Sequence, residues 1–232
     1  STDFDALATK WTVTDAAAIR EIFATGGVVW ALIRPDSDGE LHEGTIVDKT
    51  AWRLYVADQS GSTMRLRFFQ DWTTTDGLWE TTSRIINTNT RYAVAVRYDR
   101  SGGVTADPTM WVFDLDNYVY TQLDVGSGLT ESTTPVGTVV ADTGSDIVIG
   151  NNAASTKTFD GRIGTVRVYG PLGNNTYWTA KLKHAFAVAK DAPRHLDIGK
   201  TTLNWYWADN ANPLDELDRL KNSEGPGAAL YE

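Results

Sequence analysis

The sequence contains no cysteine, and its three histidines stand at positions 42, 184 and 195. Without a thiol there is no disulfide framework, no thiolate metal site and no cysteine nucleophile. No Gly-x-Ser-x-Gly motif accompanies the histidines, and no two of them stand at zinc-ligand spacing. The sequence therefore supports neither a serine hydrolase triad nor a zinc site.

Long apolar runs and an excess of basic residues are also missing. No stretch approaches the ~18 consecutive apolar residues of a membrane-spanning helix. Lys and Arg number 21 against 30 Asp and Glu, which gives a formal net charge of −9. Because binding to phosphate backbones requires clustered Lys and Arg, the sequence predicts neither membrane insertion nor nucleic-acid binding.

The first residues lack the pattern of a secretion signal. The segment STDFDALATKW has no basic stretch followed by an apolar one. A leading serine is what removal of an initiator methionine would leave, and an excised signal or tag would leave the same. Both origins stay open at this point.

Alternating apolar residues are the main positive signal. A length of 232 residues fits one all-β sandwich, which at 25.5 kDa buries a core without covalent cross-links. Over residues 91–98, Tyr and Val side chains fall on one face and Arg and Ala on the other. In residues 64–69, Met, Leu and Phe alternate with Arg65 and Arg67. Both alternations predict strands, and over residues 64–69 the pattern indicates an antiparallel strand with one wet face.

Residues 147–170, IVIGNNAASTKTFDGRIGTVRVYG, organise the rest of the chain. They predict a short buried strand, a polar loop and a longer second strand. Ile163 is out of step with Val166–Val168 by one residue, and side chains alternate with period two. The slip predicts a bulge near Gly164 or burial on both faces. We expect Phe159 and Ile163 to be buried and Val166–Val168 to lie in a central strand.

This stretch resembles the C-terminal signature of laminin G-like domains, in which an I-G pair is followed by F-D-G-x-I-x-x-V-R-V-Y, a loop and a helix. Val28–Asp36 resembles the early strand of the same family, and Trp52–Val56 and Arg91–Asp99 come in the family's order. The family belongs to the concanavalin A-like lectin and glucanase superfamily. The resemblance implies an all-β jelly-roll sandwich of two antiparallel sheets with short peripheral helices, and it specifies the fold rather than the function.

The resemblance covers roughly residues 25–190, which predict one laminin G-like domain. Before it, residues 1–24 predict an extended segment and a short helix capped by Thr14 or Asp15. After it, residues 191–232 predict an extension that packs on the sandwich.

Little in the sequence predicts catalysis. Glucanases of the superfamily place two Glu and one Asp on one strand, which sets a nucleophile and an acid about 5 Å apart. The E-x-D motif of this chain is Glu216-Leu217-Asp218, in a proline-led, helix-like segment whose closing position holds Leu220 or Lys221. A solvated helix face explains this motif better than a catalytic site. We predict that the protein is not an enzyme, with a glycoside hydrolase as the alternative.

Loop oxygens suggest calcium as an alternative ligand. Relatives of this type often hold Ca²⁺ on the sandwich rim, and Asp36, Asp38, Asn151 and Asn152 carry hard oxygen donors of the kind that Ca²⁺ prefers. Asp and Asn also populate turns for reasons of local hydrogen bonding. We predict that no cofactor is required, and calcium at these residues is a hypothesis.

Tryptophan is abundant, with nine in the chain. Trp72 and Trp79 stand in the polar segment 71–80 together with Asp71 and Asp76. Sugar-binding modules use such indoles as flat platforms while polar neighbours reach the hydroxyls. These residues therefore form a candidate glycan site. The competing interpretation, which we favour, is that the segment folds over a sheet edge and buries both rings.

The sequence as a whole predicts a non-catalytic binding or structural module. Phage and virus particles use such sandwich domains as decoration, head-fibre or tail proteins, and by this analogy a β-chain rich in Thr, Gly and Trp, without cysteine or a secretion signal, fits a virion protein. We therefore expect a virion or other extracellular surface location and contacts with virion proteins or with copies of the same chain. Glycan or cell-surface adhesion is an added expectation. The alternative is a secreted carbohydrate-binding or adhesion domain.

Overall fold

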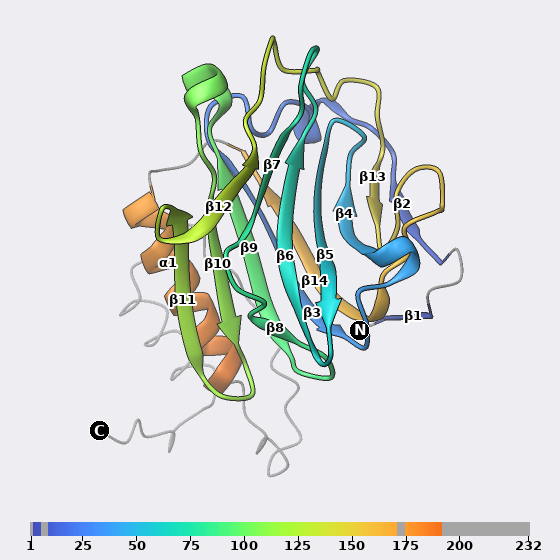
Figure 1. Cartoon of the computed structure of the whole chain (residues 1–232), viewed down its shortest axis with the longest axis vertical. Coiled ribbons are helices and arrows are strands. Elements are labelled where there is room, and N and C mark those ends of the chain that lie inside the picture. Colours follow the sequence, from blue (N-terminus) through green and yellow to red (C-terminus); the bar gives the residue numbers. More distant parts are fainter. Residues whose placement is uncertain (1, 6–8, 171–174, 192–232) are drawn as a thin grey trace, which may run out of the picture. The chain divides into compact units, whose positions relative to one another are not determined.

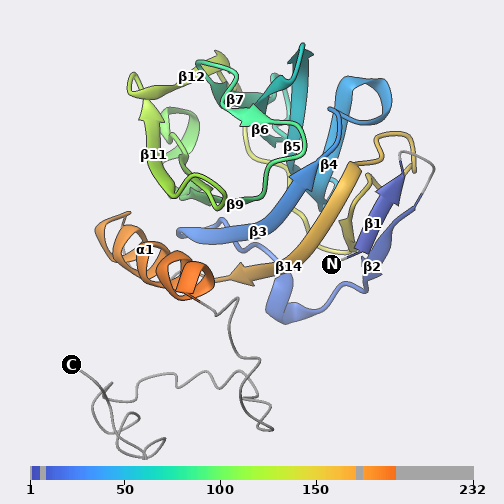
Figure 2. The same ribbon diagram turned by 90° about the horizontal axis from the view of Figure 1, so that it is seen from below.

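The computed structural model describes residues 2–5, 9–170 and 175–191. The strands form one path of hydrogen-bonded neighbours that curls into two facing layers, shown from two directions in Figures 1 and 2. We call these layers the first sheet and the second sheet. The arrangement confirms the predicted all-β sandwich.

The strands of the first sheet follow the spatial order β1 (Thr2–Asp5), β14 (Asp160–Tyr169), β3 (Gly27–Pro35), β9 (Tyr92–Tyr98), β10 (Thr109–Asp114) and β11 (Val119–Val125). Those of the second follow the order β12 (Gly128–Thr133), β7 (Gly77–Thr81), β6 (Thr63–Gln70), β5 (Trp52–Ser60), β4 (Glu43–Asp48), β13 (Ile147–Ile149) and β2 (Trp11–Val13), with β8 (Ile86–Asn87) paired to β6. Neighbours pair antiparallel except for a short parallel contact between β11 and β12, which links the two sheets.

The core between the sheets is dominated by aromatic rings. Its central cluster consists of Phe23, Trp52, Phe68, Trp79 and Tyr98. Ring centroids lie 5.2 Å apart for Phe23 and Trp52, and 5.3 Å apart for Trp79 and Tyr98. Since a buried aromatic side chain removes roughly 150–250 Å² from water, each ring contributes several kcal/mol of stability. This cluster lets the sandwich fold without disulfides.

Strand β9 is buried on both faces. Val94 and Val96 point into the core between the sheets, whereas Ala93 and Ala95 belong to a second apolar cluster on the outer face of the first sheet. Helix α1 (Asn175–Asp191) lies along that outer face, as Figure 2 shows. The helix therefore excludes water from this outer face.

Side chains of α1 complete this second cluster. Trp178 and Leu182, both 1% exposed, pack there with Trp111. Asn175 accepts a hydrogen bond from Arg97 (3.0 Å) and donates one to Thr109 (2.7 Å), which ties the start of the helix to the sheet. The helical spacing of Trp178 and Leu182 is thus explained by packing against the first sheet.

Strand β14 contains the predicted bulge. Its register against β3 shifts between Ile163 and Val166, and Phe159 and Ile163 are buried as expected. The central-strand prediction for Val166–Val168 is wrong, because among the described residues β1 pairs only with Asp160 to Ile163, and the later residues of β14 pair with β3 alone. Gly161 has φ +128°, and a Cβ there would stand 2.2 Å from the Arg34 carbonyl oxygen. That position requires glycine.

The helix predicted before residue 24 is replaced by a single 3₁₀ turn, η1 (Ala17–Ile19), without a side-chain cap. Glu21 has φ +53°, which breaks the helical path. Asp15 does not cap, because its carboxylate pairs with Arg20 (2.6 Å) and with the buried Lys49 (3.3 Å). Long-range partners therefore override the local capping signal.

Two further 3₁₀ turns, η2 (Glu40–His42) and η3 (Arg100–Thr105), complete the described elements. Contacts divide the chain into units 1–192 and 193–232, and the sandwich with α1 belongs to the first. The predictions for residues 192–232, including Glu216-Leu217-Asp218, lie outside the described residues. None of the described helices has both the length and the apolar character that crossing a membrane requires.

Candidate ligand-binding face of the second sheet

The tryptophans of the predicted glycan site are buried. Trp79 is 0% exposed, stacks on Phe68 with centroids 6.0 Å apart, and donates from Nε1 to Asp107 (3.0 Å). Trp72 is 5% exposed and forms a bridge with Val139 in a segment far along the chain. An indole without an exposed face offers no platform for a sugar, so the structure argues against these two residues as a glycan site.

Asp71 and Asp76 brace the same loop. Asp76 accepts a hydrogen bond from the backbone N–H of Trp72 (3.0 Å). Burial raises the pKa of Asp71, and its hydrogen bond to the neighbouring Asp76 carboxyl raises that pKa further. The pair holds the loop between β6 and β7 closed while the loop bonds to residues 136–140.

The candidate calcium residues use their oxygens within the protein. Asp38 is buried, and its two carboxylate oxygens accept from the Gln59 N–H (3.0 Å) and face His42 Nδ1 (3.3 Å). Asp36 pairs with Arg34 at 3.0 Å. These contacts hold the loop that contains η2 against the end of β5.

Asn151 and Asn152 order the second candidate loop in the same way. The side-chain oxygen of Asn151 accepts from the N–H groups of Asn152 (2.8 Å) and Lys157 (3.0 Å). Asn152 accepts from Thr156 N–H at 2.8 Å. Within the residues that the structure describes, no three His, Asp or Glu side chains form a group suited to a metal ion.

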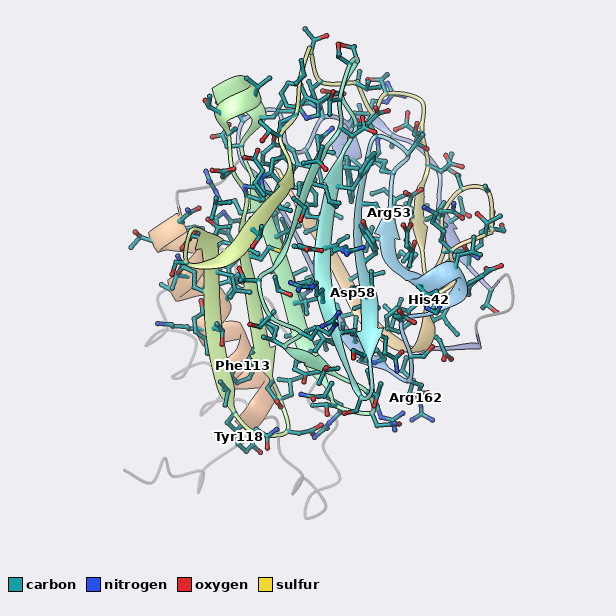
Figure 3. All side chains as sticks on the ribbon, viewed as in Figure 1. His42, Arg53, Asp58, Phe113, Tyr118 and Arg162 are labelled. Atoms are coloured by element: carbon teal, nitrogen blue, oxygen red, sulfur yellow. The ribbon has the colours of Figure 1, made fainter. Side chains whose placement is uncertain are left out.

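A different surface brings charged side chains together. The outer face of the second sheet, which points away from the core, carries a row of arginines interleaved with carboxylates. We call this surface the arginine face and define it by Glu43, Arg53, Tyr55, Asp58, Arg65, Arg67, Glu80, Arg84 and Lys157. Arg53 and Asp58, labelled in Figure 3, lie near β5 on the side turned to the viewer.

Strand register places these side chains on one face. Tyr55 of β5 lies opposite Arg67 of β6, and Arg67 in turn lies opposite Glu80 of β7. Residues directly opposite one another in an antiparallel ladder share a face, so their side chains meet. The alternation that predicted outward-pointing Arg65 and Arg67 is correct, but their acidic partners come from other strands and were not foreseen.

At one end of the arginine face, Arg53 is the best-packed cation. Its side chain is 11% exposed, pairs with Glu43 at 2.9 Å, and covers the Tyr55 ring at 4.2 Å from the centroid. Lys157 reaches across from the loop before β14 to the same Glu43 carboxylate. The Nε of Arg53 is buried and has no hydrogen-bond partner in the described part of the chain.

At the other end, three further ion pairs continue the row. Arg67 pairs with Glu80 at 2.7 Å, and Arg65 pairs with Asp58 at 2.8 Å. Arg84 binds the second oxygen of the Asp58 carboxylate at 2.8 Å. Each of these arginines is held in place by a carboxylate while 20–35% of its side chain stays exposed.

A bulge in β5 aims Asp58 at its partners. The register between β5 and β6 shifts between Ala57 and Ser60, and Asp58 has φ +57°. Aspartate tolerates this left-handed conformation better than most residues, and bulges commonly redirect a side chain. The bulge turns the Asp58 carboxylate toward both Arg65 and Arg84.

Two carboxylates of the arginine face, those of Asp58 and Glu43, are held ionised. Hydrogen bonds from Arg84 and Arg65 lower the pKa of Asp58. Burial would raise the pKa of Glu43, but the hydrogen bond from Lys157 and the charges of Arg53 and Lys157 outweigh it and lower that pKa. A general acid at neutral pH requires the opposite shift. Neither group is suited to donate a proton to a glycosidic oxygen.

Comparisons with known proteins add a fold-level likeness. No protein-family model matches the sequence, and a search of curated proteins finds no match. One similar solved structure is the LG1-3 region of the laminin α2 chain, with 12% identity and a TM-score of 0.47. The match covers 70% of this chain and 30% of that chain, so this chain spans less than a third of the laminin fragment. At this identity the likeness says nothing of what this chain binds.

Proposed function

We propose that this chain is a non-catalytic binding module whose arginine face takes a hydroxyl-rich ligand, a glycan. The observation that carries the proposal is the row of arginines fixed between carboxylates on an exposed sheet face. Side chains fixed in advance lose little conformational freedom when a ligand binds. The arginine face is therefore preorganised for a polar ligand.

The mixture of charges favours a glycan over a polyanion. Arginine side chains donate hydrogen bonds and carboxylates accept them. Arg67 can therefore donate to the oxygen of a sugar hydroxyl while the neighbouring Glu80 accepts the hydrogen of a hydroxyl. The acidic residues of the row offset much of its positive charge, and the chain as a whole carries a formal charge of −9. This balance disfavours nucleic acid, whose binding depends on a net cationic surface.

The experiment is a binding assay on a glycan array with a matched pair of variants. Arg67→Met should weaken binding by at least about tenfold, the loss expected for a charged hydrogen bond. The control is Arg91→Met, which removes an arginine–carboxylate pair at the start of β9 in the other sheet. The Arg91–Asp116 pair is exposed and should contribute about 0–1 kcal/mol to stability, whereas the Arg67–Glu80 pair is part-buried, so the unfolding of both variants is measured alongside binding. Binding that survives in Arg67→Met and in Arg53→Met would refute the proposal.

Location and assembly are further proposals. We propose a virion or other extracellular surface location, in contact with particle proteins or copies of this chain, on the composition arguments given above. A secreted adhesion domain is the alternative. Mass spectrometry of purified particles from the source organism, compared with its culture supernatant, separates the two: enrichment in particles supports the first location and enrichment in the supernatant the second.

A further inference from the structure

Among the described residues, the second sheet ends in a short apolar edge strand, β2. Strand β2 pairs with β13 on one side and stands last in the spatial order of strands. Within the described ranges, no backbone hydrogen bond joins Trp11–Val13 to any other segment. Trp11 is 51% exposed and Val13 is 46% exposed. Figure 1 shows β2 at the margin of the second sheet, beyond β13.

Natural proteins blunt such edges with very short strands, charged residues, proline, bulges or a covering segment. Strand β2 is short, with three residues, but Trp-Thr-Val contains no charge and no proline and consists of residues with high β-propensity. An edge of this composition can pair with another strand.

We propose that β2 pairs with β2 of a second copy of this chain, antiparallel across a twofold axis at Thr12. In that register Trp11 of each copy lies opposite Val13 of the other, so the four apolar side chains gather on one face. Thr12 lies opposite itself, and Lys10 lies opposite Thr14, so like charges do not face each other. This self-complementarity is what selects a second copy over an unrelated peptide. The inference does not depend on the ligand of the arginine face.

Pairing of three-residue strands buries little surface, so the dimer is expected to be weak and concentration-dependent. Sedimentation analysis of the full chain should show a monomer–dimer equilibrium. Val13→Lys should raise the dissociation constant at least about tenfold, because two desolvated ammonium groups would enter the apolar cluster. The control is Val119→Lys, which adds the same charge at a valine that is 55% exposed on β11. It should associate like the wild type.

A cross-linking experiment tests the register independently of Val13→Lys. The chain has no cysteine, so Thr12→Cys introduces a single thiol that faces its own copy. Opposed residues in an antiparallel pair have Cα atoms about 4.5–5.5 Å apart, within disulfide range. Mild oxidation should convert Thr12→Cys to a covalent dimer much faster than Val119→Cys. A chain that stays monomeric, an association that Val13→Lys leaves unchanged, or equal cross-linking of the two cysteine variants would each overturn the proposal.

Discussion

Trp79 gives the sharpest test of the core, because the sequence made it a candidate glycan-binding residue whereas the structure places it in the hydrophobic interior. The side chain is fully buried, and its six-membered ring lies close over the backbone of Gly77. Replacing it with alanine removes contacts with Phe68 and Tyr98 and leaves Asp107 without its indole partner. The change creates a large cavity that the surrounding rings cannot fill.

The magnitude follows from the buried area. Roughly 150–250 Å² at about 25 cal/mol per Å² corresponds to about 4–6 kcal/mol, and measured Trp→Ala losses in cores are about 3–5 kcal/mol. We therefore expect the free energy of unfolding to fall by about 4 kcal/mol. For a chain of this size, that loss lowers Tm by roughly 8–16 °C.

Urea unfolding followed by circular dichroism measures the effect. The matched control is Trp11→Ala at low protein concentration, because Trp11 is 51% exposed and its removal should cost less than about 1 kcal/mol. The reasoning is refuted if Trp79→Ala loses less than about 1.5 kcal/mol, or if the two variants are equally destabilised.

Further predictions concern the backbone, acid stability, metals and catalysis. Gly161→Ala should destabilise the fold strongly, since a Cβ there would stand 2.2 Å from a carbonyl oxygen. Gly103→Ala is the control, because Gly103 also has a positive φ but a Cβ there meets nothing within 4 Å, so it measures the backbone strain without the clash. Asp58→Asn should be less stable than the wild type at pH 7, and the difference should narrow below about pH 4. Because the pKa of Asp58 is lowered in the folded protein, the carboxylate stabilises the fold at pH values above its unfolded-state pKa, and this stabilisation is lost as the folded protein takes up the proton. A difference in unfolding free energy between Asp58→Asn and the wild type that stays constant down to pH 2.5 would contradict this. Chelation of calcium should leave Tm unchanged, and a shift reversed by added Ca²⁺ would show a metal site. No reducing ends should be released from laminarin, xylan or agar, and release abolished by Glu216→Gln would show that the chain is a hydrolase after all.

The sequence predicted a good part of the fold because strand patterns are local. Alternation identified the inward faces of β6 and β9, and the slip before Val166 indicated the bulge in β14. Helical spacing identified α1 through Trp178 and Leu182. In each case the signal repeats every two or every three to four residues, so it is readable without knowing which segments pair.

The surroundings of the residues predicted to bind a glycan or to cap a helix could not be predicted from local patterns in the same way. Loop 71–76 bonds to residues 136–140, more than sixty positions away, and this pairing decides that Trp72 is buried. Asp15 has the residue type and position of a helix cap, yet Lys49 and Arg20 claim its carboxylate. Local propensity was overruled wherever a side chain found a distant partner of opposite charge or a place in the core.

The amino-acid sequence by itself determined that this is a cysteine-free, acidic β-protein, which side chains of its strands point inward, and that a helix follows β14. The tertiary structure alone decided which charges meet on the arginine face, that the loop tryptophans are unavailable to a ligand, and that β2 stands last among the described strands of the second sheet. The physical reason is that inward and outward faces follow from the period of a single strand, whereas the partners of a side chain depend on strand order and register. These are set by the packing of the whole core rather than by any one segment.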